Sequence, residues 1–478
     1  MSGIWLIFVP LLLTMPSYLI SKKINFAKIL ALVLSIVMLV WSGVLYTSLP
    51  QDGSYMELGS FLHVKQFDFV LHLAVDKLSV IMLLLSSLLL VLVTLASWSV
   101  QNSRGYFALI IFFAGAIFGV FMSVNLLWFF IFWELTLIPM FFLVGIWGAE
   151  GRIYAAVKFF LYTHVASMFL LLAFFLIYKQ SGSFDMELFK ESVLLTPALI
   201  WWLMFIGFAV KMPLFPFHTW LPDAHVQAPS AVSALLAGVL LKMGAYALIR
   251  FNLLLMPTQM QKYGWVIVLI GIVTLFFAGF KALYENHIKK MIAYSSISHM
   301  GLVAIAIGSA TLSSLSSALF EMIAHALIIS PLFIIAGFIH QKTSSWEMDE
   351  MGGIMQKAPY LSAMFIVAGL GALGLPGTMG FIGEISIFIS AIQAQGVWIA
   401  FILFASMLAS GYMIYSFRRV LYAQISSRVQ LADFTMNKVE FFALTVFIFL
   451  IVLFGIFPSL LFDPINSAFG VYLAGGGA

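Results

Sequence analysis

The sequence predicts an all-α integral membrane protein, and three observations support this prediction. The chain has 478 residues, of which 63% are hydrophobic and only 9% are charged, whereas about 25% of the residues in a soluble domain are charged. Apolar stretches of helix length follow one another almost from end to end. These stretches do not alternate polar and apolar positions, as strands that span a membrane would. Lipid is therefore the solvent that suits this chain.

A spanning helix requires about 20 mostly apolar residues, and the sequence holds about fourteen candidates. They are expected near residues 4–20, 27–49, 77–98, 106–122, 124–147, 154–178, 197–217, 229–255, 264–284, 291–309, 316–339, 359–391, 394–417 and 441–462. The first stretch has no basic region before it and no small-residue cleavage site, so we expect a retained helix and not a signal peptide. Residues 50–76 could form a short hairpin, and residues 418–440 could form an interfacial helix.

The basic residues predict which ends of the helices face the cytoplasm. If the N-terminus is outside, thirteen Lys and Arg residues fall in inside loops and six in outside loops, which is the bias expected of cytoplasmic loops. The inside residues are Lys22, Lys23, Lys28, Arg104, Arg152, Lys289, Lys290, Lys342, Lys357, Arg418, Arg419, Arg428 and Lys438. The outside residues are Lys65, Lys77, Lys179, Lys190, Arg250 and Lys262. An even number of helices places both termini outside.

The predicted helices 7 and 12 are interrupted by proline and glycine, in residues 211–216 (KMPLFP) and 371–377 (GALGLPG). Proline removes a backbone donor and clashes with the preceding turn, and such breaks persist in a membrane only where protein or a wet cavity satisfies the freed groups. Transporters with inverted repeats carry broken helices at matching positions of both halves. Because these breaks lie five helices apart, helices 4–8 and 9–13 are predicted to form two inverted five-helix repeats.

The repeats divide the chain into four parts. We expect N-terminal helices 1–3 in residues 1–105, the first repeat in residues 106–255, the second repeat in residues 264–417, and a cytoplasmic loop with helix 14 in residues 418–478.

The candidate functional residues are titratable side chains that fall in the middle of apolar helices. A charged residue at a helix centre costs roughly 2.5–3.5 kcal/mol on insertion scales, so it persists where it is paired, buried in the bundle or functional. These candidates are Glu134, Lys211, Lys242, His299, His325 and Glu384. Histidine titrates near neutrality and exchanges protons at both ring nitrogens. With water filling the gaps, such a row predicts a proton relay that needs no metal.

Structural alternatives remain open at the same positions. Glu134 and Lys211 could form a static buried ion pair, because such pairs are often neutral for stability. His299 and His325 could be core histidines whose hydrogen bonds are satisfied. Tyr162 and His164 lie on the predicted helix 6 and could belong to the core or to the path.

Other kinds of site have little support in the sequence. The chain has no cysteine, which excludes disulfides, thiolate zinc sites and cysteine-bound iron–sulfur clusters. It has no strand–GxGxxG–helix unit and no Walker sequence, so no site for a redox cofactor is expected, and it has no basic stripe for nucleic acid. His218, Asp223 and His225 could hold a metal, although a complete ligand set is missing.

Two long motifs resemble a known superfamily. Residues 211–225 (KMPLFPFHTWLPDAH) and 288–301 (IKKMIAYSSISHMG) are similar to the signatures of the antiporter-like subunits of respiratory complex I, Mrp-type cation/proton antiporters and membrane-bound hydrogenases. The resemblance covers the whole chain in order. Glu384 stands where most members carry lysine, and residues 132–135 (FWEL) provide a further match. The chain also stops after helix 14, before the long lateral helix of the largest member. These features resemble the middle subunit of complex I, the chain M or chain 4 type.

The resemblance implies a role for each candidate. It implies a coupling pair on helices 5 and 7, a central relay lysine on helix 8, two connecting histidines and a terminal proton site on helix 12: Glu134 with Lys211, Lys242, His299 with His325, and Glu384. The implied function is proton translocation by a membrane subunit of NADH:quinone oxidoreductase, driven by quinone reduction in other subunits. An Mrp-type antiporter subunit or a membrane-bound hydrogenase subunit is the alternative.

The resemblance also implies the surroundings of the chain. NADH, FMN, iron–sulfur clusters and quinone would belong to partner subunits. The expected neighbours are flanking antiporter-like subunits, the lateral helix of the largest one, and lipids. The expected location is the bacterial cytoplasmic membrane, in preference to the mitochondrial inner membrane.

Overall fold

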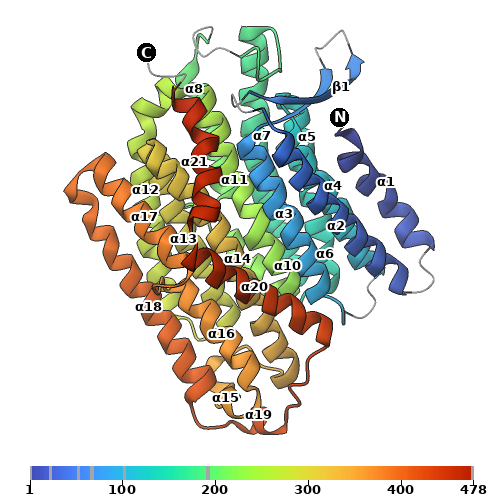
Figure 1. The fold of residues 1–478 in the computed structure, drawn as a ribbon, viewed down its shortest axis with the longest axis vertical. Helices are drawn as coiled ribbons and strands as arrows, with labels where there is room; N and C mark the ends of the chain where they lie inside the picture. Colours follow the sequence, from blue (N-terminus) through green and yellow to red (C-terminus); the bar gives the residue numbers. More distant parts are fainter. Residues whose placement is uncertain are drawn as a thin grey trace.

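The computed structural model is a bundle of helices that run roughly along the long axis of the molecule (Figure 1). It describes residues 3–20, 24–50, 54–64, 69–100, 104–189 and 194–474. In Figure 1, α1 begins and α21 ends toward the end that carries the strands, while α15 and α19 lie at the opposite end. This arrangement agrees with termini on one side, and the exact number of crossings stays a prediction.

The helices match the predicted spans closely in the first part of the chain. They are α1 (Ile4–Ile20), α2 (Ile24–Ser48), α3 (Lys77–Ala96), α4 (Arg104–Met122), α5 (Leu126–Leu135), α6 (Leu137–Trp147), α7 (Arg152–Ser181), α8 (Pro197–Lys211), α9 (Trp220–Gln227), α10 (Ser230–Leu235) and α11 (Leu241–Ala247). Two π-helical turns, η2 (Leu236–Leu240) and η3 (Leu248–Leu255), continue α10 and α11 into one long segment. An antiparallel hairpin of β1 (Met56–Val64) and β2 (Phe69–Val75) confirms the short hairpin considered for residues 50–76.

The second part of the chain continues in the same manner. Its helices are α12 (Pro257–Tyr284), α13 (Ile288–Ser309), α14 (Leu312–Thr343), η4 (Met348–Glu350), α15 (Ile354–Lys357), α16 (Pro359–Ala372), α17 (Met379–Gln395), η5 (Val397–Leu403), α18 (Phe404–Phe417), η6 (Arg418–Tyr422), α19 (Ser427–Leu431), α20 (Lys438–Ile456) and α21 (Ser459–Ala474). Across the described residues, 11 helices are long and apolar enough to cross a membrane, and shorter apolar helices accompany them. The structure is therefore the mostly helical membrane fold that the sequence predicts.

Both predicted breaks are present, and protein groups satisfy the backbone around the first. α8 ends at Lys211 and α9 begins at Trp220. The Trp220 indole N–H donates to the carbonyl of Val210 over 2.9 Å, and the N–H of Phe215 donates to Thr274 Oγ1 over 2.9 Å. A broken helix can therefore stay inside the bundle without unpaired polar groups at these positions.

The second break, between α16 and α17, depends on glycine. Gly374 and Gly377 adopt φ values of +71° and +93°, a left-handed region that glycine enters without a side-chain penalty. The N–H of Leu375 reaches the carbonyl of Leu370 over 3.0 Å. The chain can thus leave one helix and start the next within a few residues.

The last span differs from its prediction. Instead of one helix over 441–462, α20 ends at Ile456 and α21 runs on to Ala474. Phe457, which precedes Pro458, has φ −120° and ψ 66°, and proline disfavours the α conformation of the residue before it. The interfacial helix considered for 418–440 is reduced to the 5 residues of α19, which the side chain of Ser426 caps.

Arg250 corrects one predicted loop charge. It lies inside the bundle on η3, is 3% exposed, and donates two hydrogen bonds of 2.7 Å to the carboxylate of Asp76. Asp76 also accepts the N–H of Ser79 and so caps α3. This ion pair joins the start of α3 to η3. Four other predicted loop charges, Lys22, Lys23, Lys65 and Lys190, lie outside the described residues.

Glycines bring α12 and α13 into backbone contact at two levels. A Cβ atom on Gly271 would lie 2.7 Å from the carbonyl oxygen of Gly301, and one on Gly264 would lie 2.7 Å from that of Gly308. Small residues permit such close approach between helices in membranes. The helix that carries His299 is therefore held tightly against its neighbour.

Candidate functional site

Lys242 lies at the centre of the bundle and is fully buried on α11. Its Nζ atom lies 2.5 Å from His325 Nδ1 and donates to the carbonyl of Ala237 over 2.5 Å. Ala237 belongs to the π-helical turn η2, and such turns are frequent at functional sites. A Cβ atom on Gly238 of this turn would lie 2.7 Å from Leu89 Cδ1 of α3 and 3.2 Å from Ser330 Oγ of α14. The glycine therefore permits the close helix contact that brings Lys242 to His325.

The next groups lie in the second half of the chain. His299 Nδ1 lies 3.0 Å from Glu321 Oε1 and 3.9 Å from Glu384 Oε1. The ring centroids of His299 and His325 are 5.4 Å apart. Glu321 and His325 are four residues apart on α14 and so share one helix face. The structure thus brings together Lys242, His325, His299, Glu321 and Glu384 in one row.

Glu321 belongs to this row but was not among the six predicted relay residues. It satisfies the rule that identified the others, because it is a carboxylate inside a long apolar helix and is 1% exposed. Its Oε2 atom and the Nε2 atom of His325 are buried without hydrogen-bond partners among the described residues. Most buried polar atoms have a partner, so these two unpartnered atoms make Glu321 and His325 candidates for a functional role.

Two glycines make room for the carboxylates. A Cβ atom on Gly383 would lie 2.1 Å from Glu321 Oε2, and one on Gly374 would lie 2.7 Å from Glu384 Oε2. Gly374 therefore has two effects: it permits the turn between α16 and α17, and its lack of a side chain leaves space for the carboxylate of Glu384. Glu384 also faces a small cavity with His299, lined further by Ser298 and Tyr412, of about 10 Å³, the space of about one water molecule.

The predicted pair Glu134 and Lys211 does not form a direct ion pair. Glu134 Oε2 lies 2.6 Å from His164 Nδ1 on α7. Lys211 Nζ donates to Thr136 Oγ1 over 3.3 Å and lies 4.5 Å from the centroid of a Trp133 ring. Both charges adjoin the short interruption between α5 and α6. His164, left open as core or path, is thus the partner of Glu134.

Lys289 and His225 were not among the six predicted relay residues, although His225 was considered as a metal ligand. Lys289 lies in the first turn of α13, is 1% exposed, and donates to the carbonyls of Ala228 and Val226. It lines a cavity of about 530 Å³ together with residues of the predicted inside loops. Both ring nitrogens of the buried His225 lack partners among the described residues, and the ring stacks on Phe333. The sequence predicts Lys289 as a loop charge, because the hydropathy of the span rises only after it, and the structure corrects this by burying Lys289 within α13.

The metal alternative at residues 218–225 has no support in the geometry. Asp223 Oδ2 lies 2.6 Å from Lys158 Nζ, and the imidazole of His225 stacks on an aromatic ring. In the part of the chain that the structure describes, the group of His and carboxylate side chains spaced for a metal is Glu57, His72 and Glu187.

His72 lies outside the spanning segments and is held between two carboxylates. Its Nδ1 atom lies 2.7 Å from Asp185 Oδ2, and its Nε2 atom lies 2.7 Å from Glu57 Oε2. The hydrogen bond to Asp185, followed by that to Glu57, outweighs burial and raises the pKa of His72 to about 9. At neutral pH the ring is therefore protonated, and its two N–H groups donate to Asp185 and to Glu57, which lie in separate segments of the chain.

Solved structures share the whole architecture. A chain of respiratory complex I from Thermus thermophilus superposes with a TM-score of 0.87 at 24% identity, covering 99% of this chain and 100% of that one. A chain of the Mrp complex from Dietzia sp. superposes with a TM-score of 0.88 at 18% identity, covering 98% and 97%. At these identities the likeness shows the fold alone.

Sequence similarity distinguishes the family. Residues 123–410 match the family described as NADH:quinone oxidoreductase/Mrp antiporter, TM. NADH-quinone oxidoreductase subunit M of Rickettsia conorii is 36% identical over 442 residues, which is 91% of this chain and 89% of that protein. Subunit M of Escherichia coli is 36% identical over 425 residues, 85% and 83% of the two chains. With the fold and the buried row of charges in place, these similarities show that the chain belongs to the subunit M family of NADH-quinone oxidoreductase.

Proposed function

We propose that this chain transfers protons across the bacterial inner membrane through its buried row of titratable side chains, driven by quinone reduction in other subunits. Its family makes it a multi-pass membrane subunit of an NADH-quinone oxidoreductase. The observation that carries the proposal is the continuous row from Lys242 through His325, His299 and Glu321 to Glu384. Charged groups within a membrane mark ion or proton paths in general.

Each neighbour in the row can pass a proton to the next. Lys242 Nζ can donate to His325 Nδ1 across 2.5 Å. The other nitrogen of His325, Nε2, releases a proton toward His299, because imidazole takes up a proton on one nitrogen and gives one up from the other. His299 then passes it to Glu321 or Glu384. Release follows from Glu384 into the small cavity beside it.

Lys289 and His225 extend the row toward the predicted cytoplasmic side. The cavity that Lys289 lines is bounded by Gly148 and Trp346, which belong to predicted inside loops. A buried lysine that lines such a cavity can take up protons from water, and the buried His225 interacts electrostatically with both Lys289 and Lys242. We propose this cavity as the entry for protons.

The energy input acts on the first half of the chain in this proposal. A change of charge in a neighbouring subunit moves Glu134 from His164 toward Lys211, and Lys211 then exchanges its proton toward Lys242. Residues 106–255 and 264–417 act as the two inverted halves. NADH, FMN, iron–sulfur clusters and quinone belong to partner subunits, with flanking antiporter-like subunits and the lateral helix of the largest one as membrane neighbours.

Lys242→Met in the assembled, liposome-reconstituted complex tests the proposal. Methionine fills the site without a titratable group, so we expect the complex to assemble while proton uptake and coupled quinone reduction fall at least about 10-fold, which corresponds to about 1.4 kcal/mol of added barrier. Lys281→Met is the matched control, because Lys281 is an exposed lysine on a spanning helix. Lys211→Ala and Glu134→Ala should also lower pumping.

Full coupled activity of Lys242→Met would rule out the relay. A requirement for Na⁺ in the same liposomes would favour the Mrp-type alternative, whose fold the chain shares.

A further inference from the structure

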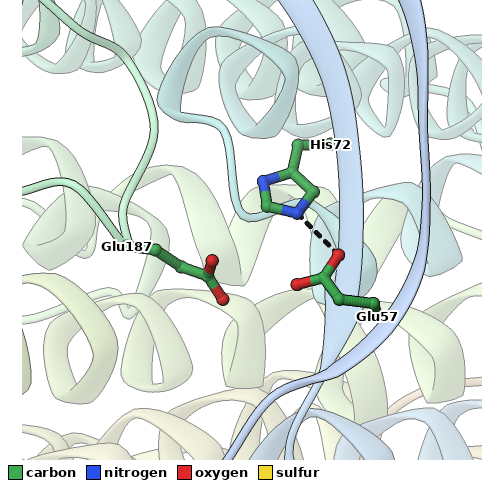
Figure 2. Close-up of side chains that lie close together, drawn as sticks. All are labelled: Glu57, His72 and Glu187. Atoms are coloured by element: carbon green, nitrogen blue, oxygen red, sulfur yellow. Dashed lines mark hydrogen bonds and ion pairs between the residues drawn. The ribbon is translucent and has the colours of Figure 1, made fainter.

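Three side chains on and beside the hairpin lie close together (Figure 2), and Figure 1 shows the hairpin at one end of the molecule. One possible ligand atom from each of Glu57, His72 and Glu187 lies within 4.8 Å of the others. Glu57 is on β1, His72 is on β2, and Glu187 follows α7. In Figure 2 the carboxylate of Glu187 points toward the hydrogen-bonded pair of His72 and Glu57. The three side chains thus converge on a common point.

A bulge in the hairpin directs Glu57 toward this point. Gly59 pairs with Leu73, but Glu57 pairs with Ala74, so one extra residue lies in β1. Glu57 and its direct partner Ala74 point to the same face of the hairpin. His72 also points to this face, because it lies two residues from Ala74 on β2. Glu57 therefore becomes a diagonal neighbour of His72, within reach of a long side chain. Bulges re-aim side chains in this way near functional sites.

Asp185 positions the other two residues of the cluster, His72 and Glu187. Its Oδ2 atom lies 2.7 Å from His72 Nδ1, and its Oδ1 atom accepts the N–H of Glu187 over 2.9 Å. A carboxylate on one imidazole nitrogen leaves the other nitrogen aimed at the site, which is the arrangement found around metal-bound histidines. The carboxylate of Asp185 therefore orients the ring of His72 and, through a backbone N–H, the position of Glu187.

The backbone around the cluster is held before any ligand arrives. The N–H of Leu126 donates to the carbonyl of Phe184 over 2.8 Å, and the N–H of Met186 donates to that of Val124 over 2.8 Å. The N–H of Val124 donates to the carbonyl of His72 over 3.2 Å. The segment after α7, the hairpin and the start of α5 thus form one frame.

From this geometry we propose that Glu57, His72 and Glu187 bind Zn²⁺, or a divalent transition metal of similar preference. One imidazole and two carboxylates are typical Zn²⁺ ligands, and water completes the tetrahedron. The side chain of Glu57 is 53% exposed, so the ion can enter from outside. It displaces the proton between His72 and Glu57, and its charge offsets the carboxylates. The site does not use the buried relay, so it stands or falls independently of the proposed function.

The test measures Zn²⁺ bound to the whole purified enzyme after equilibration with micromolar Zn²⁺ and a competing fluorescent chelator. We expect Glu57→Gln/Glu187→Gln to retain one Zn²⁺ fewer per complex than the unaltered enzyme. Asp185→Asn keeps all three ligands but loses their orientation, so its affinity should fall about 10- to 100-fold. Glu150→Gln is the matched control, because Glu150 is an exposed carboxylate in a different loop, and it should bind as the unaltered enzyme does.

Equal Zn²⁺ content in the double variant and the unaltered enzyme would overturn the proposal, and so would an equal loss in Glu150→Gln. Anomalous scattering at the zinc edge from crystals of the unaltered enzyme requires no variant. A peak between Glu57, His72 and Glu187 is expected, and its absence at saturating Zn²⁺ would refute the site even if the double variant failed to assemble.

Discussion

Gly383→Ala should disturb the buried row of titratable side chains without replacing any of them. The added Cβ atom would lie 2.1 Å from Glu321 Oε2, whereas ordinary van der Waals contact begins at 3.4 Å. The carboxylate must therefore retreat by about 1.3 Å. Its other oxygen lies 3.0 Å from His299 Nδ1, and because the carboxylate is the mobile end of the side chain, we expect it to move away and lengthen this contact beyond hydrogen-bonding distance. The variant thus separates Glu321 from His299.

The magnitude follows from three contributions. Overpacking of a core costs about 1–3 kcal/mol, and loss of a hydrogen bond to a charged group costs about 1.5–3 kcal/mol. Replacing glycine by alanine in a helix returns up to about 1 kcal/mol. The net destabilisation should be about 2–5 kcal/mol. The hydrogen-bond part alone changes the proton equilibrium between His299 and Glu321 roughly 10- to 150-fold.

The assay is proton uptake coupled to quinone reduction in liposomes that contain the assembled complex. We expect Gly383→Ala to lose uptake by at least an order of magnitude. Gly145→Ala, where the nearest atom is an ordinary 3.6 Å away, should keep it. Gly383→Ala/Glu321→Asp shortens the carboxylate and should regain part of the uptake. Normal uptake in Gly383→Ala, or no gain in the double variant, would refute the reasoning.

Two further predictions concern stability, measured as thermal unfolding of the solubilised chain. Burial, followed by the charge of Lys289, lowers the pKa of His287 to about 4, and the neutral ring caps α13 by accepting the N–H of Lys290. Its stabilisation is complete above about pH 6.5 and declines as pH falls toward 4, so His287→Asn, a cap that does not titrate, should lose less stability between pH 7 and 5. Arg250→Met leaves Asp76 buried without its guanidinium and should cost about 3–5 kcal/mol; Arg250→Met/Asp76→Asn should recover much of it.

Each stability prediction has an outcome that contradicts it. Equal losses of the unaltered chain and His287→Asn on acidification would show that this cap is not the titrating element. Equal unfolding temperatures for the single and double variants at Arg250 would show that the buried carboxylate carries no penalty.

Hydropathy predicts the spans because lipid contact demands long apolar helices. α3, expected over 77–98, runs Lys77–Ala96, and α13, expected over 291–309, runs Ile288–Ser309. α21 escaped prediction, since Pro458 interrupts the span and Asp463 lowers its hydropathy. The hairpin was considered but its register was not, because pairing and the bulge at Gly59 depend on contacts across the chain.

The sequence predicts which titratable residues belong to the candidate site, but it predicts their contact partners less well. Charges in apolar helices led to Lys242, His299, His325 and Glu384, which the structure brings together. The partner of Glu134 depends on how α7 packs against α5, which no local pattern encodes. The cluster around His72 joins residues more than a hundred positions apart, a distance that sequence spacing cannot bridge.

The glycine contacts between α12 and α13 limit how this protein can move. A slide of one helix along the other by a single residue is about 1.5 Å, and it would drive Ile305 or Val268, already 2.9 Å from the Cβ positions of Gly271 and Gly308, into backbone. We therefore expect α12 and α13, which carries His299, to move as one rigid unit. In the proposed relay, switching would therefore come from rotating side chains and shifting water and not from a slide of α12 along α13.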